Sequence, residues 1–272
     1  MSTLLEPFAY EFFRNGMIAA VIVGAVCGFV GVYVVLRRMS YIGHGLAHAL
    51  FGGAVLGSII GVNFFIGAGA WALICAALIH LISRRRLVGA DAAIGVVTTS
   101  SFALGVAIVS TYRGFTLDFE AALFGNLLGI TSVDLWVIAL TSSAVLVVMI
   151  VIRHQLLFST FDPEVAPVYG ISTNRIELIF ILVLAITIVA STRILGVTLV
   201  SAAVVIPPVI ARYLTQRFQT LLVITPVIGA LCAALGMYAS YFIDISSGAM
   251  IVLTFALIFS LVGGSWWTWR AR

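Results

Sequence analysis

Lysine is absent from the 272 residues, and charged side chains of every kind make up only 9% of them. A phosphate-binding loop of the form G-x-x-x-x-G-K-[ST] needs a lysine to reach the nucleotide phosphates, so this chain cannot contain one. If ATP drives its activity, another polypeptide must hydrolyse it. The three cysteines, Cys27, Cys75 and Cys232, lie far apart in apolar runs, which predicts packing residues and excludes a disulfide framework or a cysteine metal cluster.

Apolar residues dominate instead, at 62% of the sequence, and the charged share lies far below the roughly 25% of soluble proteins. This composition predicts an all-α polytopic membrane protein. At about 20 residues a span, 272 residues hold at most roughly ten spans, with no room for a soluble domain. We therefore expect one transmembrane domain over residues 1–272.

Polar interruptions divide the chain into about nine expected spans, and eight or ten also fit because several boundaries are soft. The segment 1–15 has no basic start and carries Glu6 and Glu11, which predicts a short interfacial helix and no cleavable signal. Glycines at helical spacing, such as Gly24 with Gly28 and Gly31 or Gly57 with Gly61, predict close helix packing. The expected spans are 16–36, 42–60, 63–83, 92–110, 133–152, 176–191, 195–212, 220–240 and 247–265.

All fourteen basic residues are arginine. An amino terminus outside the cell places eleven of them in cytoplasmic segments and leaves Arg14, Arg113 and Arg193 outside, as the positive-inside rule requires. The carboxyl terminus then lies in the cytoplasm, with the tryptophans of 266–269 as an interfacial anchor. This bias explains the net charge of +4, and no clustered basic and aromatic surface indicates nucleic-acid binding.

Two of the four histidines, His44 and His48, stand four positions apart in the second expected span. On a helix this spacing stacks both imidazoles on one face, where they can hold one transition metal ion. Polar groups removed from water without a partner cost several kcal/mol, so intramembrane histidines are candidates for function. The alternative is a structural pair bonded to carbonyls of neighbouring helices. His80 and His154, near helix ends, are expected as wetted polar tips.

The sequence lacks groups that two other classes of protein need. The pentapeptide HGLAH has the spacing of the H-E-x-x-H zinc hydrolases, but Gly45 occupies the position of their general base, which argues against an intramembrane protease. A secondary metal transporter driven by an ion gradient would use carboxylates in the middle of its spans, and none of the expected spans has one there.

The longest expected cytoplasmic loop is 153–175. In it Asp162 suits a helix N-cap, Pro163 the first helical position and Glu164 the first turn, and Gly170 is placed to end the helix about two turns later. The pattern alone fits a docking element and an ordinary capped connector equally well.

Two further features belong to the remaining spans and loops. Pro207 and Pro208 in the seventh span predict a kinked helix, which lines a pathway or is a static kink. The expected extracellular segment between the fourth and fifth spans carries Asp118 and Glu120, with Asp134 at the start of the fifth span, and these acids either attract cations or belong to a solvated loop.

Six blocks in order along nearly the whole chain resemble the membrane permease subunit of the zinc and manganese ABC importers, the ABC-3 family. This resemblance implies a compact bundle of the type II importer kind. The six blocks are RRMSYIGHGLAHALFGG, DAAIGVVTTSSFALGV, LFGN, FDPEVAPVYGI, ILGVTLVSAAVVIPPVIARYL and SYFIDISSGAMIVL.

The resemblance also implies function and partners. The chain would be a permease without catalysis in the prokaryotic plasma membrane, with no bound cofactor and a divalent zinc, manganese or iron ion as its substrate. Metal would cross at the interface with a second permease, identical or sister, on two cytoplasmic ATPase subunits fed by an extracellular metal-binding protein. A metal chelate as cargo is the alternative. The implied ATPase coupling helix comprises Asp162, Pro163, Glu164, Val165, Tyr169 and Gly170.

One departure concerns the histidine pair. The family often shows an aspartate and, four residues later, a histidine preceded by serine, where this chain has His44, His48 and Ala47. Replacing a carboxylate by an imidazole favours Zn²⁺, Fe²⁺ or Co²⁺ over Mn²⁺. His44 lies only six residues beyond Arg38, so either the helix begins before Ser40 or the pair serves a gate near the cytoplasm.

Overall fold

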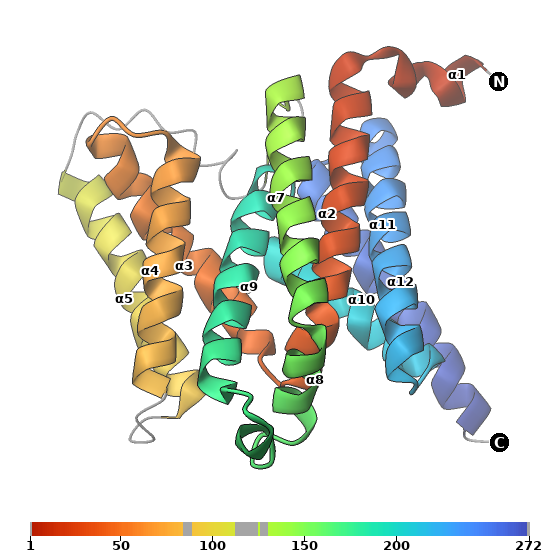
Figure 1. The fold of residues 1–272 in the computed structure, drawn as a ribbon. Helices are drawn as coiled ribbons and strands as arrows, with labels where there is room; N and C mark the ends of the chain where they lie inside the picture. The colour runs from red at the N-terminus through yellow and green to blue at the C-terminus, as the bar shows by residue number, and fades with distance from the viewer. Residues whose placement is uncertain (1, 84–88, 112–124, 126–129, 271–272) are drawn as a thin grey trace. The chain divides into compact units, whose positions relative to one another are not determined.

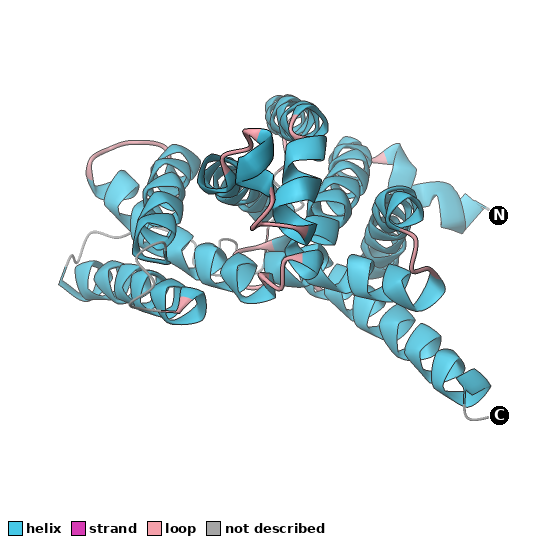
Figure 2. Cartoon of the chain, turned by 60° about the horizontal axis from the view of Figure 1, so that its bottom comes forward, coloured by secondary structure: helices cyan, strands magenta, loops and turns pink. Residues whose placement is uncertain are grey.

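The computed structural model describes residues 2–83, 89–111, 125 and 130–270, and within these ranges it contains helices and turns but no strand (Figure 2). The predicted all-α fold is confirmed. In chain order the elements are α1 (Ser2–Leu5), η1 (Glu6–Ala9), α2 (Glu11–Leu36), α3 (Ser40–Ile59), α4 (Phe64–Ser83), α5 (Ala90–Thr111), α7 (Ser132–Val151), α8 (Arg153–Phe161), η2 (Ala166–Tyr169), α9 (Thr173–Leu195), α10 (Val200–Leu214), α11 (Phe218–Ile243) and α12 (Ser247–Arg270).

Eight of the described helices are long and apolar enough to cross a membrane, and eight of the nine expected spans correspond to them. The ninth corresponds to α10, which has 15 residues and a length of about 22 Å, short of the roughly 30 Å hydrocarbon core. The expected span 195–212 is therefore corrected to a shorter helix that starts five residues later. At the amino end, α2 begins at Glu11 and not at residue 16.

The chain forms two compact units. The first unit consists of Met1–Arg38, Asp118–Ser142 and Ala190–Arg272, and in it α2 packs against α10 and α11 while α12 packs against the same two helices (Figure 1). The second consists of Met39–Leu117 and Ser143–Val189, and its central contacts join α3 to α4 and α5 (Figure 1).

A glycine stripe on α2 makes the first unit tight. A Cβ on Gly24 would overlap the carbonyl of Gly229 in α11, and one on Gly28 would lie 2.7 Å from the carbonyl oxygen of Thr225. A Cβ on Gly31 would overlap the carbonyl of Val204 in α10. The packing role predicted for these glycines is confirmed, because only a residue without a side chain lets the backbones approach this closely.

Glycine plays two different roles along α3. A Cβ on Gly57 would lie 2.9 Å from the Cα of Gly67 in α4, so Gly57 is a contact residue as predicted. Gly61 is not, because it has a φ of +74° and no neighbour within reach. Its N–H donates to the carbonyl of Ser58 while that of Val62 donates to the carbonyl of Gly57, the bond pattern of a glycine-terminated helix end.

Candidate metal site

The candidate site lies on α3, whose start is fixed by a sharp turn after α2. Arg38 has a φ of +57°, a left-handed conformation that breaks the helix between Leu36 and Ser40. Because α3 begins at Ser40, an earlier helix start does not explain the position of the histidines. His48 lies about 12 Å along an axis of about 30 Å, in the half of the helix nearer to Arg38.

The two imidazoles meet on one face of α3 as the spacing predicts. Their Nε2 atoms lie 3.2 Å apart and their rings are edge to face, with centroids at 4.5 Å. His44 is exposed and His48 half-buried on the single chain. Two aromatic rings flank the pair: Tyr41 lies 6.3 Å from His44, and Phe102 of α5 lies 5.7 Å from His48, both between ring centroids.

The separation of the two nitrogens suits a shared metal ion. Two nitrogen ligands, each about 2.0–2.1 Å from a tetrahedral zinc ion, lie about 3.3 Å from one another. The same separation is an N–H···N hydrogen bond when one of the facing nitrogens carries the proton. In the part of the chain that the structure describes, no third histidine, cysteine or acid joins the pair, so the pair offers two of the four ligands that a tetrahedral zinc ion takes.

Sequence reasoning missed the residues that hold α3 beside the pair. Ser101 of α5 donates a hydrogen bond to the carbonyl of Ala49, the residue after His48, and accepts one from the indole N–H of Trp71. The available signal was a polar serine in an apolar span, which often marks a contact between membrane helices. The sequence could not show which helix the serine meets.

The predicted coupling helix needs a correction. Asp162 is not an N-cap, because α8 extends to Phe161 and Asp162 is its C-cap. The only helix between Asp162 and Gly170 is the short 3₁₀ helix η2, with Val165 as its N-cap and Pro167 in its first turn. Gly170 ends it as predicted, with a φ of +75° and an N–H that donates to the carbonyl of Pro167.

This segment is apolar and open on the single chain. Val168 is 83% exposed and Tyr169 70% exposed, while Ala166 is fully buried and fixes the segment. The ring of Tyr169 packs edge to face against Phe158 of α8, with centroids at 5.3 Å.

Pro207 and Pro208 lie inside α10 and are buried. Because proline has no N–H, Pro208 leaves the carbonyl of Val204 without its usual helical donor. That carbonyl is the group against which the backbone of Gly31 packs, so α2 shields it from lipid.

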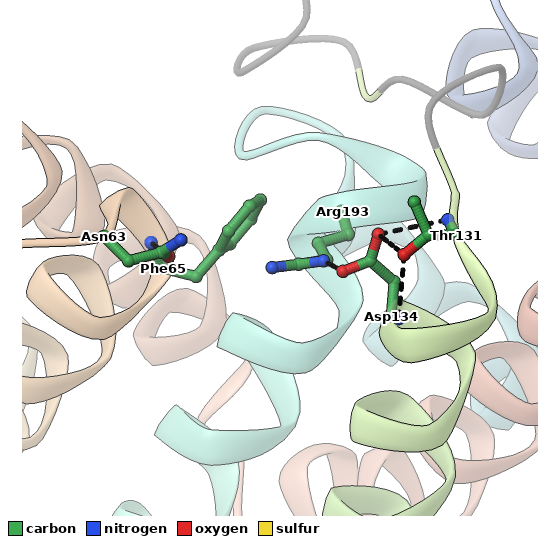
Figure 3. A network of polar contacts seen from close by, with 5 residues as sticks. All are labelled: Asn63, Phe65, Thr131, Asp134 and Arg193. Carbon is green, nitrogen blue, oxygen red and sulfur yellow. Dashed lines mark hydrogen bonds and ion pairs between the residues drawn. The ribbon is translucent and has the colours of Figure 1, made fainter.

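A polar network joins the ends of α7 and α9 (Figure 3). Thr131 and Asp134 form a reciprocal cap at the start of α7, in which the Thr131 N–H donates to the carboxylate and the Asp134 N–H donates to the threonine hydroxyl. Arg193, in the last turn of α9, pairs with the same carboxylate. Asp134 is thus part of a helix start and an ion pair, and of its two predicted roles the solvated loop is wrong.

The remaining sequence predictions have separate outcomes. The three cysteines are free and buried, as predicted. His80 is 3% exposed, so its assignment to a wetted helix end was wrong, whereas His154 is exposed and accepts a hydrogen bond from Arg153. Asp118, Glu120 and most of the LFGN block lie outside the described residues, as do the side chains of the tryptophans in 266–269.

The helices and the imidazole pair define a multi-pass, all-helical membrane protein. Comparison with known proteins makes the class more specific. Residues 9–263 match the ABC 3 transport family. The chain therefore belongs to this family, and its fold is that of the type II importer permeases, as the resemblance predicted.

Relatives cover nearly the whole chain. The manganese transport system membrane protein MntC of Halalkalibacterium halodurans is 36% identical over 256 residues, which cover 94% of this chain and 88% of that protein. The probable iron transport system membrane protein of Haemophilus influenzae is 32% identical over 259 residues, 95% and 92% of the two chains. The structure of PsaBC from Streptococcus pneumoniae in complex with Fab matches with a TM-score of 0.85 at 29% identity, covering 96% and 94%.

Proposed function

We propose that this chain is the permease subunit of an ATP-driven importer for divalent transition metal ions in a prokaryotic plasma membrane. The observation that carries the proposal is the His44–His48 pair, with its nitrogens 3.2 Å apart in a membrane-spanning helix. Relatives named for manganese and iron transport support a metal ion as the substrate. The chain has no catalytic role in this proposal, and a separate ATPase hydrolyses the nucleotide.

A second permease completes the metal site. Two imidazoles leave a divalent ion short of the four or more ligands that it takes. His44 is exposed on the single chain, so a twofold axis beside it would surround one path with four imidazoles. We propose an identical second copy, and a sister permease would serve the same geometry. We propose separately that α10, which has Pro207 and Pro208 inside it, is a helix that lines a pathway.

The metal ion binds to this site transiently. A transport site must release its ion, so we propose a transient station in the half of α3 near Arg38. The positive-inside rule places that half towards the cytoplasm, with the amino terminus outside and residues 1–15 at the outer interface. Imidazole at position 44 favours Zn²⁺, Fe²⁺ or Co²⁺ over Mn²⁺, and an extracellular metal-binding protein delivers the ion.

The loop 153–175 is the proposed contact with the ATPase. Val168 and Tyr169 expose apolar surface on the short helix η2, which follows α8 and precedes the membrane-spanning helix α9. An exposed apolar patch of this kind marks an interaction site. Movement of the ATPase pair would pass through this contact and alternate the outward and inward openings at the permease interface.

The experiment measures uptake of metal by vesicles that contain the permease and its ATPase. Changing both His44 and His48 to alanine is expected to lower uptake at least tenfold, with protein yield and basal ATP hydrolysis retained. Val168→Asp is expected to stop uptake by uncoupling the ATPase while Co²⁺ binding persists. Unchanged uptake in the double histidine variant would remove the pair from the path. Uptake by the permease alone, without an ATPase, would favour a secondary transporter.

The carboxylates in the described helices argue against that secondary transporter. Asp91, Asp134 and Glu177 all lie within the first five residues of their helices and not in mid-span, where a proton or sodium relay would be expected. A metal chelate as cargo is tested by the same vesicles, because a chelate permease would transport a siderophore complex and ignore the free ion.

A further inference from the structure

We propose that Ser101 of α5 is a positioning residue that holds the His44–His48 pair in register through its hydrogen bond to the backbone of α3. This inference rests on the proposed function, because it concerns the geometry of the same metal site. Ser101 touches neither imidazole, and it acts through the backbone of α3.

The hydrogen bonds of Ser101 give it this role. Ser101 is 5% exposed, and its hydroxyl donates to the carbonyl oxygen of Ala49 at 2.9 Å and accepts from Nε1 of Trp71 at 2.7 Å. A serine hydroxyl has one proton to donate and two acceptor positions, so both bonds form together and the proton points to α3. One side chain on α5 therefore links α3 and α4 at a single level of the bundle.

That level is the level of the metal pair. Ala49 follows His48 directly, and Phe102, which follows Ser101, places its ring edge to face against the ring of His48. Consecutive residues of α5 thus contact consecutive residues of α3. One turn further on, a Cβ at Gly52 would lie 2.8 Å from the Ser101 hydroxyl, so the two backbones are already as close as they can come.

Rotation of α3 is the movement that these contacts prevent. A side-chain atom about 6 Å from a helix axis moves about 2 Å when the helix turns by 20°. Binding sites tolerate about 0.5 Å of misplacement. A small rotation would therefore leave the two imidazoles present but turned away from the ion and from the second permease.

The test uses the assembled permease and ATPase in lipid nanodiscs, with Co²⁺ as the probe because its visible absorption reports the number and geometry of its ligands. Ser101→Ala is expected to weaken Co²⁺ binding about three- to tenfold, less than the 10- to 100-fold typical of a direct partner of a ligand, and to change the absorption band. Ser101→Cys, which keeps the volume and weakens both bonds, is expected to fall between Ser101→Ala and the unmodified protein.

Two control variants separate positioning from general packing. Trp71→Phe removes the bond from α4 and leaves the bond to Ala49, so its Co²⁺ affinity and spectrum should match those of the unmodified protein. Ser58→Ala removes a hydroxyl that bonds within α3 to Ala54, and it should also have no effect on binding.

The outcomes are distinct. Ser101→Ala with unchanged affinity and spectrum overturns the positioning role, whatever its melting temperature. Equal losses in Ser101→Ala and Trp71→Phe overturn it as well, because the effect would then be one of packing. If removing both histidines leaves Co²⁺ binding intact, the proposed metal site itself fails. Loss of binding in that variant, together with an unaffected Ser101→Ala, rejects only the inference made here.

Discussion

The helices α2 and α3 are built alike and differ in what they leave open. Both are rich in glycine and largely buried, with close backbone contacts to two other helices each. Between residues 16 and 36, α2 has no histidine and no acid, whereas α3 leaves Tyr41 and His44 exposed and His48 half-buried beside Phe102 of α5. Glycine contacts decide which sides of a helix are buried, and the remaining side is free for chemistry.

The comparison predicts different failures for the two helices. Replacing a packing glycine on α2 should lower the stability of the fold, because the contacts of these glycines contribute only to the packing of the first unit. Replacing a packing glycine on α3 should also lower metal uptake by the molecules that fold correctly. Each of the following experiments tests one side of this division.

The largest expected effect is that of Gly31→Ala in α2. The added methyl group would overlap the carbonyl of Val204, which is backbone and cannot turn aside, so α2 and α10 must separate. We expect a loss of about 3 kcal/mol or more, seen as aggregation or a greatly lowered melting temperature in detergent. Gly95→Ala is the matched control, because a Cβ there meets nothing within 4 Å. Equal melting temperatures for the two variants would contradict the packing account.

An effect of intermediate size, on metal uptake, is expected for Gly52→Ala in α3. Its methyl group would overlap the carbonyl of Ser101 and push α3 away from α5, next to the imidazole pair. The folded fraction should transport metal several-fold more slowly per molecule, measured as uptake normalised to correctly folded permease. Gly24→Ala in α2 serves as the comparison, and its folded fraction should transport at the normal rate. Normal uptake per folded Gly52→Ala molecule would contradict the claim that glycine contacts of α3, unlike those of α2, affect metal transport.

The smallest expected effect is a change of preference in His44→Asp. A carboxylate in place of an imidazole should raise uptake of Mn²⁺ relative to Zn²⁺ by a few-fold, because oxygen ligands suit Mn²⁺ better. Competition uptake with both metals measures this preference. An unchanged metal ratio would place selectivity outside this permease.

Local patterns predicted the helices and the histidine face because both depend on spacing along one chain. They predicted the wrong structure where a motif was compatible with two different helix ends. The run Asp162–Pro163–Glu164 fits a helix start, but the preceding helix runs up to Asp162 and uses it as a C-cap. Asp134 was grouped with the acids of the expected extracellular segment, but together with Thr131 it caps the start of α7. Local chemistry alone does not say which neighbouring helix a capping residue serves.

Other features depended on tertiary contacts and could not be read from spacing at all. Ser101 becomes informative only when Trp71 and Ala49 are seen to lie on either side of it. The place of His80 near a helix end predicts an interfacial residue, whereas the folded chain buries it. Spacing along the sequence does not reveal either outcome.

The ion pair between Asp134 and Arg193 has a mechanical consequence. It ties α7 to α9 at the ends remote from their connecting loop, and that loop carries the exposed residues Val168 and Tyr169. A hairpin closed at both ends resists splaying. If this loop contacts an ATPase as proposed, the ion pair would oppose separation of the two helices when the loop is displaced.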